Sequence, residues 1–197
     1  MVSILKTDKI QASHGSTIEI PTGHSVNAVD TAGIYAPGQI IQIVRTTPAT
    51  TSSVTLSSSP PNMIEFSSDN RTTITPKFAT SLLRLNFSSM ISGQNSSAIC
   101  SMKFYDQTNN ANVGFSALGT GSSRTFCNAS FRTKDHDAND RVHLNMTAYE
   151  AASNTTARTY SIYGMIESGT MYMNMTTTDN AGCSYCPPVF TIEEIAQ

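Results

Sequence analysis

Apolar and polar residues alternate with a period of two along most of this chain, in short runs separated by turn-forming clusters. Leu83, Leu85 and Phe87 alternate with mostly polar neighbours, and Met102 and Phe104 follow the same pattern. A period of two places successive side chains on opposite faces of a strand. Many short strands with turn signals between them predict an all-β fold, an antiparallel β-sandwich or jelly roll.

The pattern predicts a long series of strands. After short strands at 16–20 and 25–30, the strongest strand covers 39–45, and residues 46–59 form a loop or a weak edge strand. We expect the remaining strands near 63–67, 71–75, 82–89, 98–105, 112–118, 124–131, 142–149, 157–166, 169–176 and 189–195.

Composition supports the all-β prediction. Charged residues make up 13% of the chain, and there are 26 serines, 26 threonines and 14 asparagines. Helix surfaces are normally built from glutamate, lysine and arginine, whereas threonine and valine suit a pleated surface. The composition therefore argues against a helical bundle and against a doubly wound α/β enzyme.

Charge and hydropathy exclude two classes of partner. Twelve lysines and arginines against 14 aspartates and glutamates do not supply the basic face that nucleic-acid binding needs. The densest apolar run, residues 40–44, has the length of a strand, so we expect no membrane insertion. The first residues lack an apolar signal sequence, which predicts synthesis in a cytoplasm without secretion.

The four cysteines leave three alternatives open. Cys100 and Cys127 lie in strand-like runs, where a free cysteine behaves as a small apolar residue. Cys183 and Cys186 have the spacing of a redox or zinc pair, but two prolines and a strand follow them instead of a helix. The pair is interpreted as two thiols in a loop or one disulfide. A zinc site would need other cysteines or a histidine to join it.

One polar cluster resembles the start of a calcium loop. Asp135, Asp137 and Asn139 follow the alternating spacing of the first ligands, but Asp140 stands where glycine is required and Met146 where the bidentate glutamate is required. We therefore interpret the cluster as a solvated loop between strands.

No motif carries a catalytic signature, and we expect a protein that is not an enzyme and uses no cofactor. The histidines have no recognisable nucleophile beside them: His14, His24, His136 and His143. Glu193 and Glu194 point to opposite faces of a strand, which is unsuitable for a carboxylate pair. Asp106 and Glu167 are isolated carboxylates that only folding would bring together. We assign no catalytic, cofactor-binding or metal-binding residue.

Methionines alternate along one predicted strand. Met171, Met173 and Met175 share one face, which favours packing in the core, with a protein contact surface as the alternative.

The first part of the chain differs from the rest. Its strands are too short and too poor in apolar residues to bury a core alone, and such strands become stable when identical copies pair around an axis. We expect residues 1–45 to form an N-terminal segment of this kind and residues 46–197 to form the sandwich domain.

Several stretches, in the same order, resemble structural proteins of the virions of marine tailed bacteriophages, including tail fibres. They are residues 6–11, 16–24 and 31–44, residues 74–78 at the start of the globular part, the hairpin formed by 160–163 and 168–172, and the closing residues 191–197. The resemblance implies a homotrimeric virion appendage, with an intertwined N-terminal β-stalk that contacts other virion proteins and a C-terminal sandwich knob. This chain lacks a long repetitive stalk, which favours a short knob or a head-mounted fibre.

Three functions fit the resemblance. The first is attachment of the virion to a glycan or protein of the host surface. The second is decoration and stabilisation of the capsid. The third, a tailspike that degrades polysaccharide, is disfavoured because the sequence has no repeat of 20–50 residues. Polar turns such as Asp106–Asn110 suit saccharide recognition, because amides and hydroxyls can bond to sugar hydroxyls.

Overall fold

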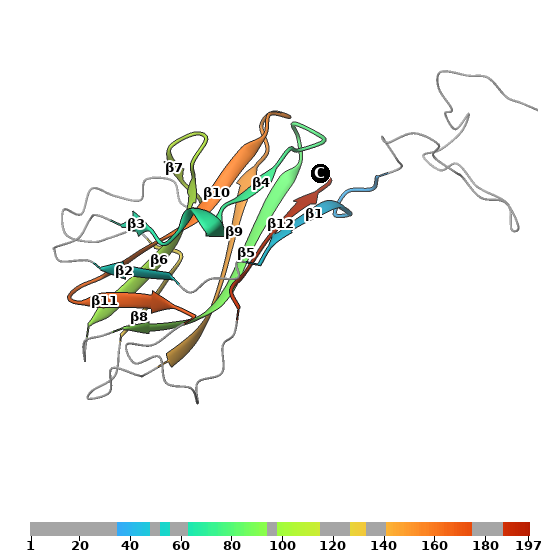
Figure 1. The fold of residues 1–197 in the computed structure, drawn as a ribbon. Helices are drawn as coiled ribbons and strands as arrows, with labels where there is room; N and C mark the ends of the chain where they lie inside the picture. The colour runs from blue at the N-terminus through green and yellow to red at the C-terminus, as the bar shows by residue number, and fades with distance from the viewer. Residues whose placement is uncertain are drawn as a thin grey trace, which may run out of the picture. The chain divides into compact units, whose positions relative to one another are not determined.

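Two antiparallel sheets pack face to face in the computed structural model of the chain, which describes residues 35–47, 52–55, 63–93, 98–114, 127–132, 141–174 and 187–197 (Figure 1). For residues 52–55 and for Arg141 the backbone alone is described. Within these described ranges each sheet has six strands. The all-β sandwich predicted from the sequence is confirmed.

The first sheet is built around the long strand β5 (Leu82–Gly93). β9 (Arg141–Ala151) pairs with one edge of β5. The other edge pairs with β12 (Val189–Ile195) and, further along, with β11 (Thr170–Met173). β1 (Ile40–Thr46) pairs with β12, and β2 (Ser52–Thr55) pairs with β11.

The second sheet is built around β10 (Arg158–Ile166) and β6 (Ile99–Asp106). The short strands β3 (Ile64–Glu65) and β4 (Thr72–Ile74) pair with β10, and the 3-10 turn η1 (Ser68–Asn70) joins them. β7 (Ala111–Asn112) and β8 (Ala129–Arg132) pair with β6. In the first sheet, residues 52–55 (β2) form the weak edge strand that the sequence allowed.

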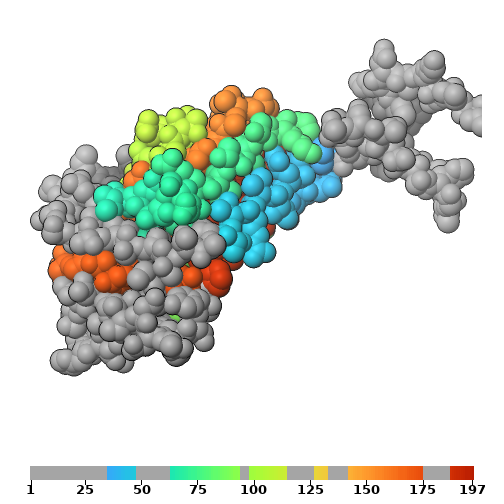
Figure 2. Space-filling model, viewed as in Figure 1, coloured from blue at the N-terminus to red at the C-terminus, as the bar shows by residue number. Residues whose placement is uncertain are grey.

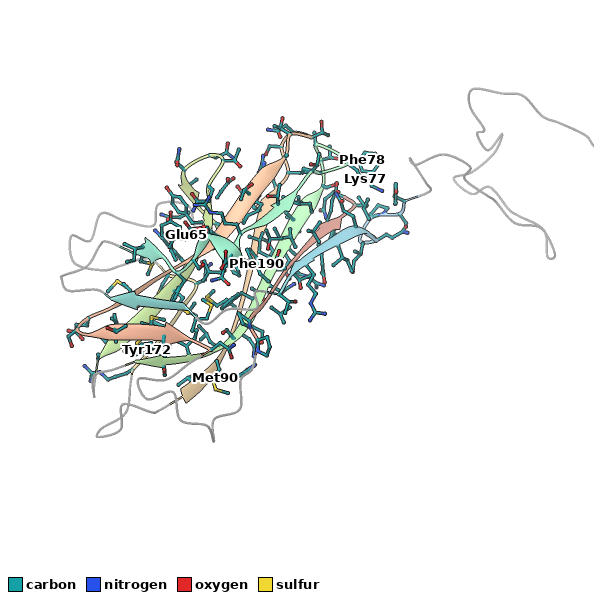
Figure 3. The ribbon with its side chains drawn as sticks, viewed as in Figure 1. Glu65, Lys77, Phe78, Met90, Tyr172 and Phe190 are labelled. Carbon is teal, nitrogen blue, oxygen red and sulfur yellow. The ribbon has the colours of Figure 1, made fainter. Side chains whose placement is uncertain are left out.

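The inward faces of the two sheets form one apolar core. Leu83, Leu85 and Phe87 of β5 are buried, as the alternation predicts. The rings of Phe190 on β12 and Phe104 on β6 stack with their centres 5.5 Å apart, so they join the two sheets. Figure 3 shows Phe190 in the middle of the sandwich.

Two further positions are explained by the core. Met171 and Met173 are fully buried, so the core-packing interpretation is confirmed for them, whereas Met175 lies outside the described residues. Gly164 on β10 lies against the buried ring of Phe66, and a Cβ atom there would clash with the ring atom Cε2. Glycine lets this ring cover the strand.

The sandwich takes in part of the segment that we predicted to precede it. β1 pairs with β12 from Ile40 opposite Ile195 to Thr46 opposite Phe190, and Val44 packs against the core. The compact unit extends over Tyr35–Gln197, so it begins before the predicted boundary between residues 45 and 46. Residues 1–34, which hold the rest of the predicted stalk, lie outside the described residues.

Candidate functional site

The turn between β6 and β7, selected from the sequence as a polar loop, is held by its first residue. Asp106 is fully buried, and its Oδ1 accepts hydrogen bonds from the backbone N–H groups of Thr108 (2.8 Å) and Asn109 (3.0 Å). Its Oδ2 accepts from Asn109 Nδ2 at 2.6 Å. A short polar side chain that bonds to the backbone two residues later fixes a turn of this kind. The carboxylate of Asp106 is therefore engaged within the loop.

Gln107 connects this turn to the neighbouring strand β10. Its Nε2 donates to Ser161 Oγ at 2.7 Å and to the hydroxyl of Tyr163 at 3.1 Å. Its backbone N–H donates to the carbonyl of Thr159 at 2.8 Å. The turn is thus fixed against β10 on the face that points away from the core. In Figure 2 the region of the turn, coloured yellow-green, lies at the surface.

Two tyrosine rings pack against each other next to Gln107. Tyr105 of β6 and Tyr163 of β10 have ring centres 4.5 Å apart, with 34° between the ring planes. The register explains the contact, because Tyr163 lies opposite Lys103 and Tyr105 lies opposite Ser161. The tyrosines are therefore diagonal neighbours on one face, a separation that aromatic side chains can bridge. Both rings are half-buried.

Lys103 completes the cluster from the same face of β6. Its Nζ lies 5.2 Å from the ring centre of Tyr105 and 5.7 Å from that of Tyr163, and it donates to Asn112 Oδ1 at 2.7 Å. Burial lowers the pKa of the Lys103 ammonium, because it has lost part of its hydration. We call the following residues the tyrosine platform: Lys103, Tyr105, Gln107, Asn112, Ser161 and Tyr163.

A compensated ion pair borders the platform. Glu65 on β3 lies opposite Tyr163, and both of its carboxylate oxygens accept hydrogen bonds from Arg71, each at 2.7 Å. Figure 3 shows Glu65 beside β3. Because Arg71 holds this carboxylate in a bidentate pair, Glu65 adds little net charge beside the platform.

The chemistry of the platform suits a ligand with both flat apolar faces and hydroxyl groups. The aromatic rings contribute apolar contact area and defined geometry. Nε2 of Gln107 and Oδ1 of Asn112 are engaged within the platform, so these amides offer a ligand Oε1 of Gln107 as an acceptor and Nδ2 of Asn112 as a donor. A sugar ring has this combination of C–H faces and hydroxyl edges.

A second surface feature lies on the outward face of the first sheet. A shallow hollow of about 140 Å³ is lined by short polar side chains, among them Asn86, Asn145, Thr147 and Thr191. Beyond it, Ile43 is 58% exposed and Tyr149 is 51% exposed. Glu193 and Arg84, which form an ion pair, lie in register between these two residues.

The structure separates the carboxylates that the sequence left as a candidate pair. Asp106 is the last residue of β6, while the backbone N–H of Glu167 donates to Ile99, the first residue of β6. Glu193 faces outward to Arg84, and Glu194 is buried, as the strand pattern predicts. Within the described ranges, no three or more histidine, cysteine, aspartate or glutamate side chains gather in a way that could hold a metal ion.

The described cysteines do not come together. Cys100 lies opposite Phe131, and Phe131 is four residues after Cys127 in the chain. Four residues of extended strand span roughly 13 Å, so the two cysteines lie apart. Burial raises the pKa of the Cys100 thiol to about 12, so it is an unreactive core residue. Cys183 and Cys186, and the calcium-like cluster of Asp135, Asp137 and Asn139, lie outside the described residues.

No protein-family model matches the chain, and no curated protein sequence matches it. Among the residues that the structure describes, no helix is long and apolar enough to cross a membrane.

Sequence reasoning selected the turn but missed the tyrosine platform. The alternation along β6 already placed Lys103 and Tyr105 on the same face of that strand, and the alternation along β10 placed Tyr163 on one face of its own strand. What was missing was the pairing of β6 with β10 and its register, which brings these residues of distant segments together.

Proposed function

We propose that this chain is a non-enzymatic structural protein of a tailed-bacteriophage virion, a short trimeric fibre or knob that attaches to saccharides of the host surface. The observation that carries the attachment role is the tyrosine platform. It presents two adjacent aromatic rings on the paired strands β6 and β10, with one amide side chain from the turn after β6 and one from β7. The resemblance of the sequence to virion proteins supports the virion assignment.

Copy number suits such a site. One open platform on a sheet face makes few contacts and binds weakly, whereas several copies on one particle bind together with much higher avidity. A trimer held by its N-terminal segments would carry three platforms. The proposed partners are therefore two further copies of the chain, other virion proteins and a host glycan.

Removal of one platform ring tests the attachment role. In Tyr163→Ala and Tyr105→Ala, retention on an array of bacterial lipopolysaccharide and capsule oligosaccharides should fall at least tenfold, because stacking area is lost. Tyr149→Ala is the matched control, since this tyrosine is exposed on the other sheet. It should bind as the unmodified protein does, and the melting temperature of each variant shows whether it is folded.

Two results would contradict the attachment role. One is failure of the assembled unmodified protein to bind any oligosaccharide of the array. The other is equal binding by folded platform variants and the Tyr149→Ala control. Release of new reducing ends from any polysaccharide would instead favour the tailspike alternative.

A capsid-decoration role is the second candidate. It is favoured by the outward face of the first sheet, where Ile43 and Tyr149 are both more than half exposed, because aromatic and aliphatic side chains of this kind are common in protein contacts. Binding to purified capsids that is lost in Tyr149→Ala, together with no binding to the array, would support this candidate over attachment.

A further inference from the structure

The cations of the described residues fall into two groups. Arg71, Arg84 and Arg158 each pair with a carboxylate, respectively Glu65, Glu193 and Glu150. Lys103 forms no ion pair with any carboxylate in the described part of the chain. Three other described cations also have no ion pair with a described carboxylate: Arg45, Lys77 and Arg132. These three are exposed to solvent, whereas Lys103 is half-buried.

The surroundings of Lys103 hold the ammonium without neutralising it. Asn112 Oδ1 accepts one of its three N–H groups, and the two tyrosine rings offer their electron-rich faces within about 6 Å. The ammonium therefore keeps donors for a further acceptor. Its lowered pKa has the same origin, since burial has removed water from a charge that no anion balances.

A carboxylate is the group that would complete this site. A charge-assisted hydrogen bond between an ammonium and a carboxylate is about twice as strong as one between neutral groups. Glu65, which lies opposite Tyr163, is already held by Arg71 through both carboxylate oxygens, each at 2.7 Å. The anion must then come from the ligand.

We infer that the tyrosine platform takes an acidic saccharide, with a sugar ring against Tyr105 and Tyr163 and its carboxylate on Lys103. This inference rests on the proposed function and names the class of saccharide. The distance of 5.2 Å from Nζ to the ring centre of Tyr105 places the ammonium within about one sugar ring of the aromatic surface. Gln107 Oε1 and Asn112 Nδ2, the amide atoms not used in the bonds to Ser161, Tyr163 and Lys103, are then the groups for hydroxyls of the same or the next sugar.

Matched acidic and esterified oligosaccharides test the charge preference on the unmodified 197-residue chain. The probes are oligomers of galacturonate, alginate, hyaluronate and sialic acid, each with its methyl ester, which keeps the rings and removes the charge. At least one acid should bind at least tenfold more tightly than its ester, and raising the salt concentration should weaken binding of the acid more than that of the ester. Isothermal titration calorimetry measures both.

Variants then assign the preference to one side chain. Lys103→Gln should reduce the ratio of acid to ester affinity from tenfold or more to near one, and Lys103→Arg should retain most of it. Lys77→Gln is the matched control, because Lys77 also lies near a tyrosine ring, with its Nζ 5.8 Å from the ring centre of Tyr35. It should leave the ratio unchanged.

The outcomes separate this inference from the proposed function. Equal binding of acid and ester by the unmodified protein, or an unchanged ratio in a folded Lys103→Gln variant, overturns the acidic class while saccharide attachment stands. Failure to bind any probe of this set or of the bacterial array overturns both. The ratio in the unmodified protein needs no variant, so a misfolded variant does not prevent a decision.

Discussion

Replacing Glu194 with alanine is expected to lower the free energy of unfolding by about 3–4 kcal/mol, measured by chemical denaturation. The side chain is fully buried, and its two oxygens accept hydrogen bonds from the backbone N–H groups of Lys77 and Phe78 at 2.8–3.0 Å. Gln42 Nε2 donates a further bond at 2.6 Å. Figure 3 shows Lys77 and Phe78 beside the start of β1. Alanine would leave the two backbone N–H groups without an acceptor, whereas Gln42 would keep its bond to the carbonyl of Thr75.

The neighbouring glutamate provides the control for this variant. Glu193 points outward to Arg84, so Glu193→Ala should cost no more than about 1 kcal/mol. A loss of less than 1 kcal/mol in Glu194→Ala, or equal losses in the two variants, would contradict the role assigned to Glu194.

The same carboxylate predicts a dependence of stability on pH. Burial opposes ionisation of Glu194, but the hydrogen bonds that it accepts, first among them the one from the backbone N–H of Lys77, together outweigh burial and hold its pKa below the ordinary 4.5. A folded-state pKa below the unfolded value gives stabilisation that is present at neutral pH and lost as the pH falls through the folded-state pKa. The glutamine of Glu194→Gln does not ionise, so the part of the stability that the ionised carboxylate loses as the pH falls should be absent in this variant.

Replacing Arg158 with methionine is expected to lower the free energy of unfolding by about 3–5 kcal/mol. The side chain is 5% exposed at the end of the sandwich, where it donates to the carbonyls of Ala151 (3.2 Å) and Ala152 and lies 3.5 Å from Glu150 Oε1. It thereby ties the start of β10 to the end of β9, one strand from each sheet. Methionine would leave two carbonyls and a half-buried carboxylate without their cation.

Two measurements distinguish this loss from a simple packing defect. Burial raises the pKa of Glu150, and Arg158 opposes the rise, so Arg158→Met should raise this pKa further. A raised folded-state pKa favours the folded state as the pH falls, so the variant should recover stability on acidification from pH 7 towards 5. Adding Glu150→Gln should recover part of the loss at pH 7. A loss below 1 kcal/mol, or no recovery by either route, would contradict the account.

The strands could be predicted from the sequence because burial has the same period as the backbone pleat. The buried positions 83, 85 and 87 of β5 and 100, 102 and 104 of β6 are readable as single runs. The pairing of strands was not readable, because it depends on contacts between segments far apart in the chain. β1 illustrates this: its apolar run predicts a strand, but its place beside β12 follows from residues 189–195 at the other end of the chain.

The platform was beyond sequence reasoning for the same reason. Lys103 and Tyr163 are separated by 60 positions, and each is an ordinary outward residue of its own strand. Gln107 was recognised as part of a polar turn, but its bonds to Ser161 and Tyr163 depend on where β10 lies. The role of Glu194 required the structure too, since its donors come from Lys77 and Phe78, more than a hundred positions earlier.

We propose that identical copies of this chain assemble through their N-terminal segments into a trimer that presents several platforms together. Native mass spectrometry of the purified 197-residue chain counts the copies. We expect a mass of about 64 kDa, three times the 21.2 kDa of one chain. A mass of one chain, unchanged at increasing protein concentration, would contradict it.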